Sequence, residues 1–171
     1  QGLWGWSVWL QQHSTALTAP FTALAVRAAV GQMAKLFIAG ENIASASKAL
    51  ARLRSQGFLF TIDLLGERSL SEKEALAYQA RYLETLAVLG SDPAWREPPR
   101  LGAGQPLEQR PIHLSVKLSA LYSQCYALNF ERSAAILSAR LAEIAQKAHQ
   151  VGARICVDAE DAARNPIIFA V

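Results

Sequence analysis

The stretch IHLSVKL, residues 112–118, alternates apolar and polar side chains along its whole length. Successive side chains of a β-strand point to opposite faces, so this alternation predicts a strand whose apolar face consists of Ile112, Leu114 and Val116. The opposite face ends in Lys117, a charge at the C-terminal tip of the strand. We therefore expect one face to pack under helices and the other to carry polar chemistry.

Two further runs have the same design. The aromatic and β-branched run from Phe58 to Ile62 is followed by Asp63, and the run from Arg154 ends in Asp158. Each strand thus has a charge at its C-terminal tip, with a small residue expected one layer below it: Thr61, Ser115 and Cys156. Because side chains alternate in the same way along all three strands, we expect the charges to lie on one face of a sheet, at matching depth.

Segments with helical periodicity separate these strands. Ser71 and Glu74 form a capping-box pattern, and the following helix is expected to carry Leu76, Ala80, Leu83 and Ala87 along one side until Gly90. A second helix bears Leu137, Leu141, Ile144 and Ala148. Residues 91–111, rich in proline and glycine, are predicted to be a surface loop, either an insertion or a lid. Helices between strands predict parallel pairing with right-handed connections, and hence an α/β protein.

The three terminal charges favour one kind of α/β fold. A doubly wound sheet buries both of its faces under helices, where three charges are hard to accommodate. A (β/α)8 barrel instead collects charged strand ends at its C-terminal mouth. We therefore expect the first three strands of a TIM-like barrel in residues 57–171, preceded by a helical arm in residues 1–56.

Composition excludes several classes of protein. The 171 residues are 51% hydrophobic and 18% charged, with a net charge of +3 and no cluster of basic residues, which argues against binding of nucleic acid. No apolar run approaches the ~18 residues of a membrane span, so a cytoplasmic protein is expected. The histidines and cysteines lack metal-ligand spacing, so no metal site is predicted. Because the sequence starts at Gln1 and not at Met, we expect a fragment of a longer protein.

Each site candidate has a structural alternative. Lys117 either extends to solvent or meets an anion, and Asp158 is either a site residue or the N-cap of the next helix. A lysine at a barrel strand end is also compatible with a Schiff-base aldolase. A non-catalytic barrel remnant is the third hypothesis.

Four motifs add a family resemblance: FIAGE at 37–41, DLLGE at 63–67, SVKLSALY at 115–122 and VDAED at 157–161. In order and spacing they resemble the proline dehydrogenase domain, especially that of the bifunctional bacterial proline-utilization enzymes. The similarity runs from about Ala25 to Asp161.

The resemblance implies a distorted (β/α)8 barrel that binds FAD, oxidises L-proline to 1-pyrroline-5-carboxylate and passes electrons to a quinone. By this resemblance Lys117 binds the substrate carboxylate, Asp158 is the active-site aspartate beside the flavin, and Ala159 contacts the flavin. Glu67 matches a glutamate at the pocket rim that pairs with an arginine from the last barrel helix. A fused or separate 1-pyrroline-5-carboxylate (aldehyde) dehydrogenase is an implied partner, and the resemblance is compatible with peripheral membrane association of the parent protein.

The resemblance also implies parts that this sequence does not contain. In the family, five further strands supply most FAD contacts and the paired arginines that hold the proline carboxylate. Here the sequence ends at Val171, shortly after the third expected strand. We therefore expect little activity from the chain by itself.

Overall fold

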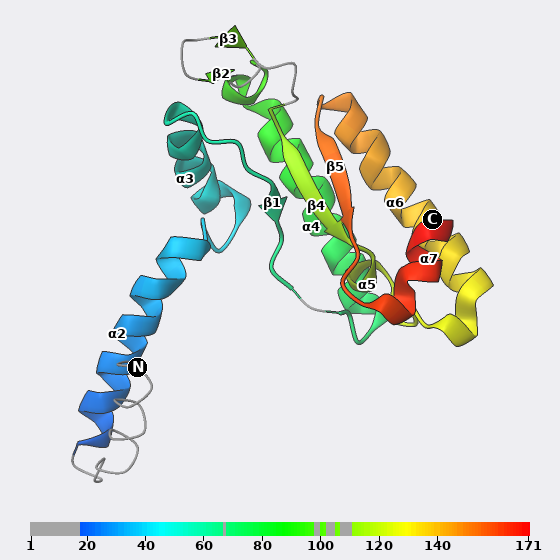
Figure 1. The fold of residues 1–171 in the computed structure, drawn as a ribbon, viewed down its shortest axis with the longest axis horizontal. Helices are drawn as coiled ribbons and strands as arrows, with labels where there is room; N and C mark the ends of the chain where they lie inside the picture. Colours follow the sequence, from blue (N-terminus) through cyan, green and yellow to red (C-terminus); the bar gives the residue numbers. More distant parts are fainter. Residues whose placement is uncertain (1–17, 67, 98–99, 102–104, 107–110) are drawn as a thin grey trace. The chain divides into compact units, whose positions relative to one another are not determined.

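The computed structural model describes residues 18–66, 68–97, 100–101, 105–106 and 111–171. The chain divides into two compact units, Gln1–Ala46 and Ser47–Val171. Helix α2 (Ala19–Phe37) lies in the first unit, and helix α3 (Ile43–Ser55) begins in the first and ends in the second. Every strand of the described residues lies in the second unit, and Figure 1 labels these strands.

A parallel three-stranded sheet organises the second unit. Its strands are β1 (Ile62–Asp63), β4 (His113–Lys117) and β5 (Arg154–Asp158), in the order β1-β4-β5. Helix α4 (Glu72–Ser91) connects β1 to β4, and helix α6 (Phe130–Gln150) connects β4 to β5. The predicted α/β class and parallel pairing are confirmed. Three strands do not close a barrel, so β1 and β5 are the edges of this sheet.

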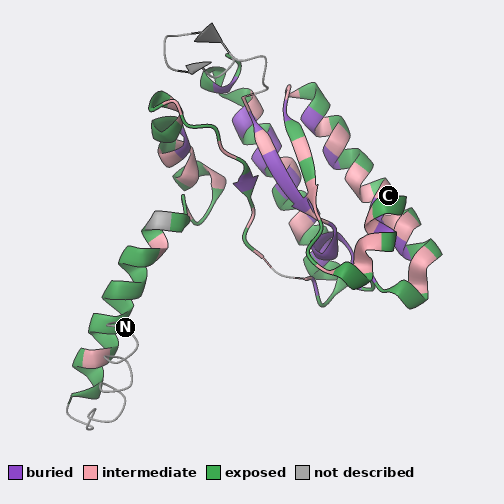
Figure 2. Ribbon diagram, viewed as in Figure 1, coloured by how far each residue is buried: buried purple, intermediate pink, exposed green. Residues whose placement is uncertain are grey.

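The core of the second unit lies between the parallel sheet and helices α4 and α6 (Figure 2). Leu114 and Val116 on β4 are fully buried, whereas His113 and Lys117 on the opposite face are only partly covered. Helix α6 buries Leu137, Ile144 and Ala148 as its periodicity predicts, whereas Leu141 is only partly buried. The central strand therefore has one face in the core and one face available for chemistry.

The first strand is shorter than the run 58–62 suggests. The Phe58 N–H donates to the Leu53 carbonyl at 3.1 Å, and Gly57 adopts a φ of 82°. These features form a Schellman cap on α3, in which glycine supplies the left-handed turn. Since its amide ends the helix, Phe58 does not join the sheet, and its side chain is 58% exposed instead of buried.

The buried stripe of α4 also differs from the expected one. The expected stripe is largely exposed, with Leu76 at 53%, while the adjacent stripe is buried: Ala75, Gln79, Tyr82, Thr85, Leu86 and Leu89. Two polar residues within it, Gln79 and Thr85, hide this buried stripe in the sequence. Gln79 is compatible with burial because its amide donates to the Glu143 carboxylate at 2.7 Å. The Ser71–Glu74 capping box is present as predicted.

The stretch 91–111 has more structure than a plain loop. It contains a 3₁₀ turn, η1 (Pro93–Trp95), and the antiparallel strands β2 (Arg100–Leu101) and β3 (Gln105–Pro106). Trp95 is only 2% exposed, and its ring packs edge-on against Phe60 with centroids 5.9 Å apart. Trp95 therefore packs this stretch against the segment that precedes β1.

Short elements complete the chain: α5 (Leu118–Leu121), η2 (Ala127–Asn129), η3 (Ala162–Arg164) and α7 (Asn165–Ala170). Among the residues that the structure describes, no helix combines the length and apolarity needed to cross a membrane.

The position of the α4 stripe predicts a contrast between two leucines on one helix. Leu86→Ala should lower the free energy of unfolding by about 2–5 kcal/mol because it leaves a cavity in the core. Leu76→Ala, a matched change on the exposed side, should cost less than about 1 kcal/mol. Urea denaturation followed by circular dichroism measures both. Equal losses would contradict the assignment of the buried face.

Candidate active site

Lys117 lies at the centre of a charged cluster built from all three parallel strands. Its Nζ is 2.6 Å from Asp63 Oδ1 and 3.6 Å from Asp158 Oδ2. The lysine side chain is only 12% exposed, against 42% for Asp63 and 33% for Asp158. Lys117 therefore meets anions instead of extending to solvent. The expected gathering of the three charges on one face of the sheet is confirmed.

Strand β1 is shifted along the sheet relative to β4 and β5, and the alternation of side chains does not reveal this shift. Lys117 pairs with Asp158, but Asp63 pairs with Ser115, two residues before Lys117. The expected matching depth of all three charges is therefore wrong for Asp63. Thr61 is correspondingly lower as well, and its hydroxyl lies 3.0 Å from His113 Nδ1. The long stem of Lys117 bridges the offset.

The carboxylates keep Lys117 protonated. Partial burial by itself lowers the pKa of an ammonium group, but the Asp63 hydrogen bond and the charges of Asp63, Glu160 and Asp158 outweigh burial and raise the Lys117 pKa. Because the pKa in the folded state is the higher one, the resulting stabilisation is complete below the unfolded pKa of about 10.4 and disappears as pH rises through the folded value.

Glu160 is a site residue that the sequence did not single out. Its Oε2 accepts a hydrogen bond from the Ser119 hydroxyl at 2.8 Å. Ser119 and Glu160 each lie two residues beyond the paired Lys117 and Asp158, and this equal offset is the signal that could have revealed them. One ammonium group thus faces three carboxylates, so the strand ends carry an excess of negative charge.

Tyr82 holds the backbone of the lysine and was also missed. The Lys117 N–H donates to the Tyr82 hydroxyl oxygen at 3.2 Å, and the tyrosine is fully buried on α4. Burial raises the pKa of Tyr82 despite the opposing influence of the Lys117 backbone N–H and ammonium charge, so the phenol stays neutral. Tyr82 belongs to the concealed stripe of α4, which explains why its role was not apparent from the sequence.

Asp158 pairs with Lys117 and does not cap a helix. The cap of η3 is Asp161, whose Oδ1 accepts from the Ala163 N–H at 2.9 Å. Asp158 Oδ1 instead lies 3.7 Å from the Cys156 thiol on the same face of β5. The N-cap alternative for Asp158 is therefore wrong.

The layer beneath Lys117 and Asp158 is formed by Ser115 and Cys156, which lie side by side in the register, and by Asp63, which pairs with Ser115 on the other side. Ser115 is 4% exposed, and its hydroxyl oxygen has no hydrogen-bond partner in the described part of the chain. Ala159 follows Asp158 and is exposed, while Glu67 lies outside the described residues. No group of three or more possible metal ligands occurs among the described residues.

The geometry predicts that, of the three carboxylates, Asp63 raises the pKa of Lys117 most, against the opposing effect of burial. Asp63→Asn keeps the side-chain size but removes the charge at 2.6 Å, so the Lys117 pKa should fall by about one unit or more. Asp158→Asn should have a smaller effect, because its distance is 3.6 Å. NMR titration of ¹³C-methylated lysines measures both, with Lys73 as an exposed internal reference. An unchanged Lys117 pKa in Asp63→Asn would refute this assignment.

Comparison with known proteins identifies related sequences. The family model described as proline dehydrogenase matches residues 46–171. The bifunctional protein PutA of Klebsiella aerogenes is 30% identical over 148 residues, which cover 86% of this chain and 10% of that protein. PutA of Escherichia coli strain K12 is 29% identical over the same share of both chains. The chain therefore spans about a tenth of the length of these relatives.

Solved structures agree with this relationship. Proline utilization A from Bdellovibrio bacteriovorus, inactivated by N-propargylglycine, matches with a TM-score of 0.76 and 34% identity, over 87% of this chain and 16% of that one. A mutant of the Bradyrhizobium japonicum enzyme matches with a TM-score of 0.61 and 28% identity, over 90% and 15% of the two chains. With its family match covering most of its length and its charged cluster at the ends of parallel strands, this chain belongs to the proline dehydrogenase family.

Proposed function

We propose that this chain forms the first part of a (β/α)8 barrel that oxidises L-proline to 1-pyrroline-5-carboxylate with FAD. The observation that carries the proposal is the Lys117 cluster at the C-terminal ends of parallel strands, in a chain of the proline dehydrogenase family. Active sites of such barrels lie at this end of the strands. The domain division proposed with it is an arm in residues 1–56 and the barrel from residue 57.

The cluster suits a zwitterionic substrate. Lys117 offers an ammonium group to the proline carboxylate, while the excess of carboxylates from Asp63, Asp158 and Glu160 attracts the secondary ammonium of proline. Because Asp63 already binds Lys117, a substrate carboxylate has to share this ammonium with it. Further cations are therefore needed for firm binding, and we assign them to the strands that follow in the complete protein.

The residues of the exposed face fit a flat flavin ring. Beneath Asp158 the side chains of Ser115 and Cys156 are small, and the buried Ser115 hydroxyl retains unused hydrogen-bonding capacity. Ala159 is exposed and presents only a methyl group. We propose that Asp158 and Ala159 hold the flavin, with Glu67 at the rim of the substrate pocket. FAD supplies the hydride acceptor; the side chains supply position and electrostatics.

The charge state of Lys117 argues against a Schiff-base aldolase. Such an enzyme needs an unprotonated lysine, which desolvation or a neighbouring cation provides. Here burial lowers the pKa of Lys117 less than Asp63 and the other carboxylates raise it.

The partners proposed from the family relationship are L-proline, a quinone acceptor and a fused or separate 1-pyrroline-5-carboxylate dehydrogenase. The proposed location is the cytoplasm, with peripheral membrane association during electron transfer to the quinone.

The role of Lys117 is testable in the complete enzyme. Lys117→Met keeps much of the stem but deletes the charge, so kcat/KM for proline should fall about 10- to 100-fold. The loss should be much smaller for pyrrolidine, which lacks the carboxylate. Lys73→Met, an exposed change on α4, is the control. Equal losses for both substrates would exclude the carboxylate role, and unchanged kinetics would leave Lys117 without a catalytic function.

The chain by itself is predicted to bind FAD poorly. Its parallel sheet has three strands and two open edges, and the polar face of that sheet is solvent-accessible at Thr61, Asp63 and Cys156. Absorbance near the flavin maximum after purification and desalting measures bound cofactor. Stoichiometric flavin on the purified chain would contradict this prediction.

A further inference from the structure

The backbone that follows Lys117 directly is a single helical turn with little support of its own. Helix α5 contains only Leu118–Leu121, and no side chain caps its N-terminus. All four residues are buried. A helix of one turn leaves most of its carbonyls without internal partners, so groups from other elements decide its conformation.

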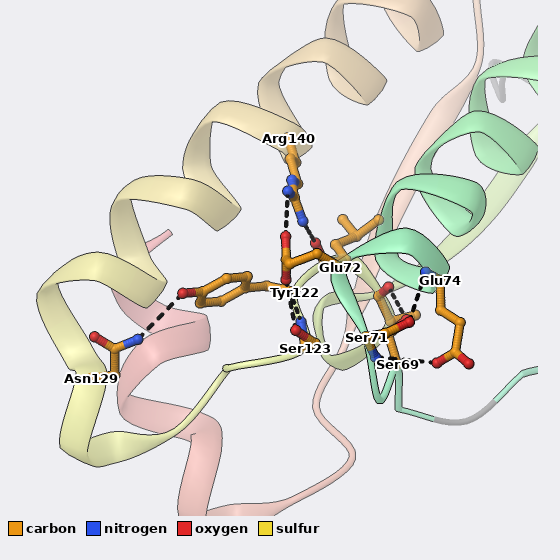
Figure 3. Close-up of polar contacts among 10 residues, drawn as sticks. Ser69, Ser71, Glu72, Glu74, Tyr122, Ser123, Asn129 and Arg140 are labelled. Atoms are coloured by element: carbon orange, nitrogen blue, oxygen red, sulfur yellow. Dashed lines mark hydrogen bonds and ion pairs between the residues drawn. The ribbon is translucent and has the colours of Figure 1, made fainter.

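Those partners come from the segment before α4 and from α6 (Figure 3). The Ser69 N–H donates to the Ser119 carbonyl at 3.2 Å, and the Ser69 hydroxyl donates to the Ala120 carbonyl at 2.6 Å. The third carbonyl, of Leu121, accepts from Arg140 Nη1. Three successive carbonyls of the turn are therefore satisfied by two residues outside it.

Arg140 also binds a carboxylate that holds the next part of the chain. Its Nη2 is 2.8 Å from Glu72 Oε2, and Glu72 Oε1 accepts from the Ser123 N–H at 3.1 Å and the Ser123 hydroxyl at 2.7 Å (Figure 3). Burial raises the pKa of Glu72, but the hydrogen bonds from Ser123 and Arg140 outweigh burial and lower it. Glu72 is therefore ionised at neutral pH. One arginine thus ties α6 both to α5 and to the first residue of α4.

Helix α4 also holds the backbone of Lys117, at the start of the turn. Tyr82 and Glu72 both lie on α4, and the Tyr82 hydroxyl accepts the Lys117 N–H. The corner from β4 into α5 is therefore fixed at its start by Tyr82 and at its end by Glu72 and Arg140. The Lys117 ammonium must project from this corner to within 2.6 Å of Asp63 and 3.6 Å of Asp158.

We propose that Arg140 and Glu72 are positioning residues for Lys117, holding the β4–α5 corner so that the ammonium group reaches its carboxylates. Neither residue is assigned a contact with the substrate. The consequence for catalysis rests on the proposed function of Lys117, but the effect on the geometry of Lys117 does not.

The fork of Arg140 is the feature to test. Arg140→Lys keeps the charge but has a single ammonium group, which cannot replace the planar fork that binds the Leu121 carbonyl and Glu72 together. Glu72→Gln keeps the size but weakens the link to Arg140. Arg132→Met, an exposed change on the same helix, is the matched control. Circular dichroism at the temperature of the titration establishes that each variant is folded.

The readout in the full chain is the Lys117 pKa, measured by NMR titration of ¹³C-methylated lysines. If the corner loosens, the ammonium withdraws from Asp63, Asp158 and Glu160, so Arg140→Lys and Glu72→Gln should each lower the Lys117 pKa by about half a unit or more. Arg132→Met should leave it unchanged. A lower melting temperature with an unchanged Lys117 pKa in both variants would overturn the proposal, because it indicates stabilisation without positioning.

Two further results complete the test. A direct effect of the Arg140 charge predicts the opposite sign: Arg140→Met would raise the Lys117 pKa and Arg140→Lys would not change it, which would overturn the proposal. In the complete enzyme, Arg140→Lys should reduce kcat/KM for proline more than for pyrrolidine, as Lys117→Met does. If Arg140→Lys lowers the Lys117 pKa while Lys117→Met leaves proline oxidation intact, positioning is supported and the proposed function fails.

Discussion

The pleat of strand β4 is the constraint on which the rest of this structure depends. The same alternation that buries Leu114 and Val116 completely places Lys117 on the opposite face, beside β1 and β5. A shift of one residue in the strand would put the charge into the core and expose Leu114 and Val116 to water. The hydrophobic energy of the buried face therefore fixes the side of the sheet on which the lysine appears.

Compensation of the Lys117 charge is the second requirement. A lysine side chain that is only 12% exposed needs anionic partners for its ammonium group, and Asp63 and Asp158 come from the two neighbouring strands. Their combined charge exceeds that of the lysine, and Glu160 increases the excess. The proposed binding of a zwitterionic substrate rests on this combination of one ammonium group with several carboxylates.

Helix α4 connects the core to the site. Its buried stripe includes Leu86 and Leu89, which contribute apolar area, and Tyr82, whose hydroxyl holds the Lys117 backbone. At its first residue, Glu72 accepts hydrogen bonds from Ser123 and pairs with Arg140. Packing of this one helix therefore stabilises the unit and also orients the strand end that carries the lysine.

The sequence by itself determined the α/β class, the parallel pairing implied by the helical connections, the capping box at Ser71 and the gathering of Lys117, Asp63 and Asp158. These follow from local rules, since alternation and periodicity act over a few residues. Only the tertiary structure decided the offset of β1, the buried stripe of α4 and the contacts of Tyr82, Glu160 and Arg140. Buried polar residues such as Gln79 hide a core stripe until their partner, here Glu143 on α6, is known. Register and hydrogen bonding between distant segments depend on how whole elements pack, so the pattern within one segment does not determine them.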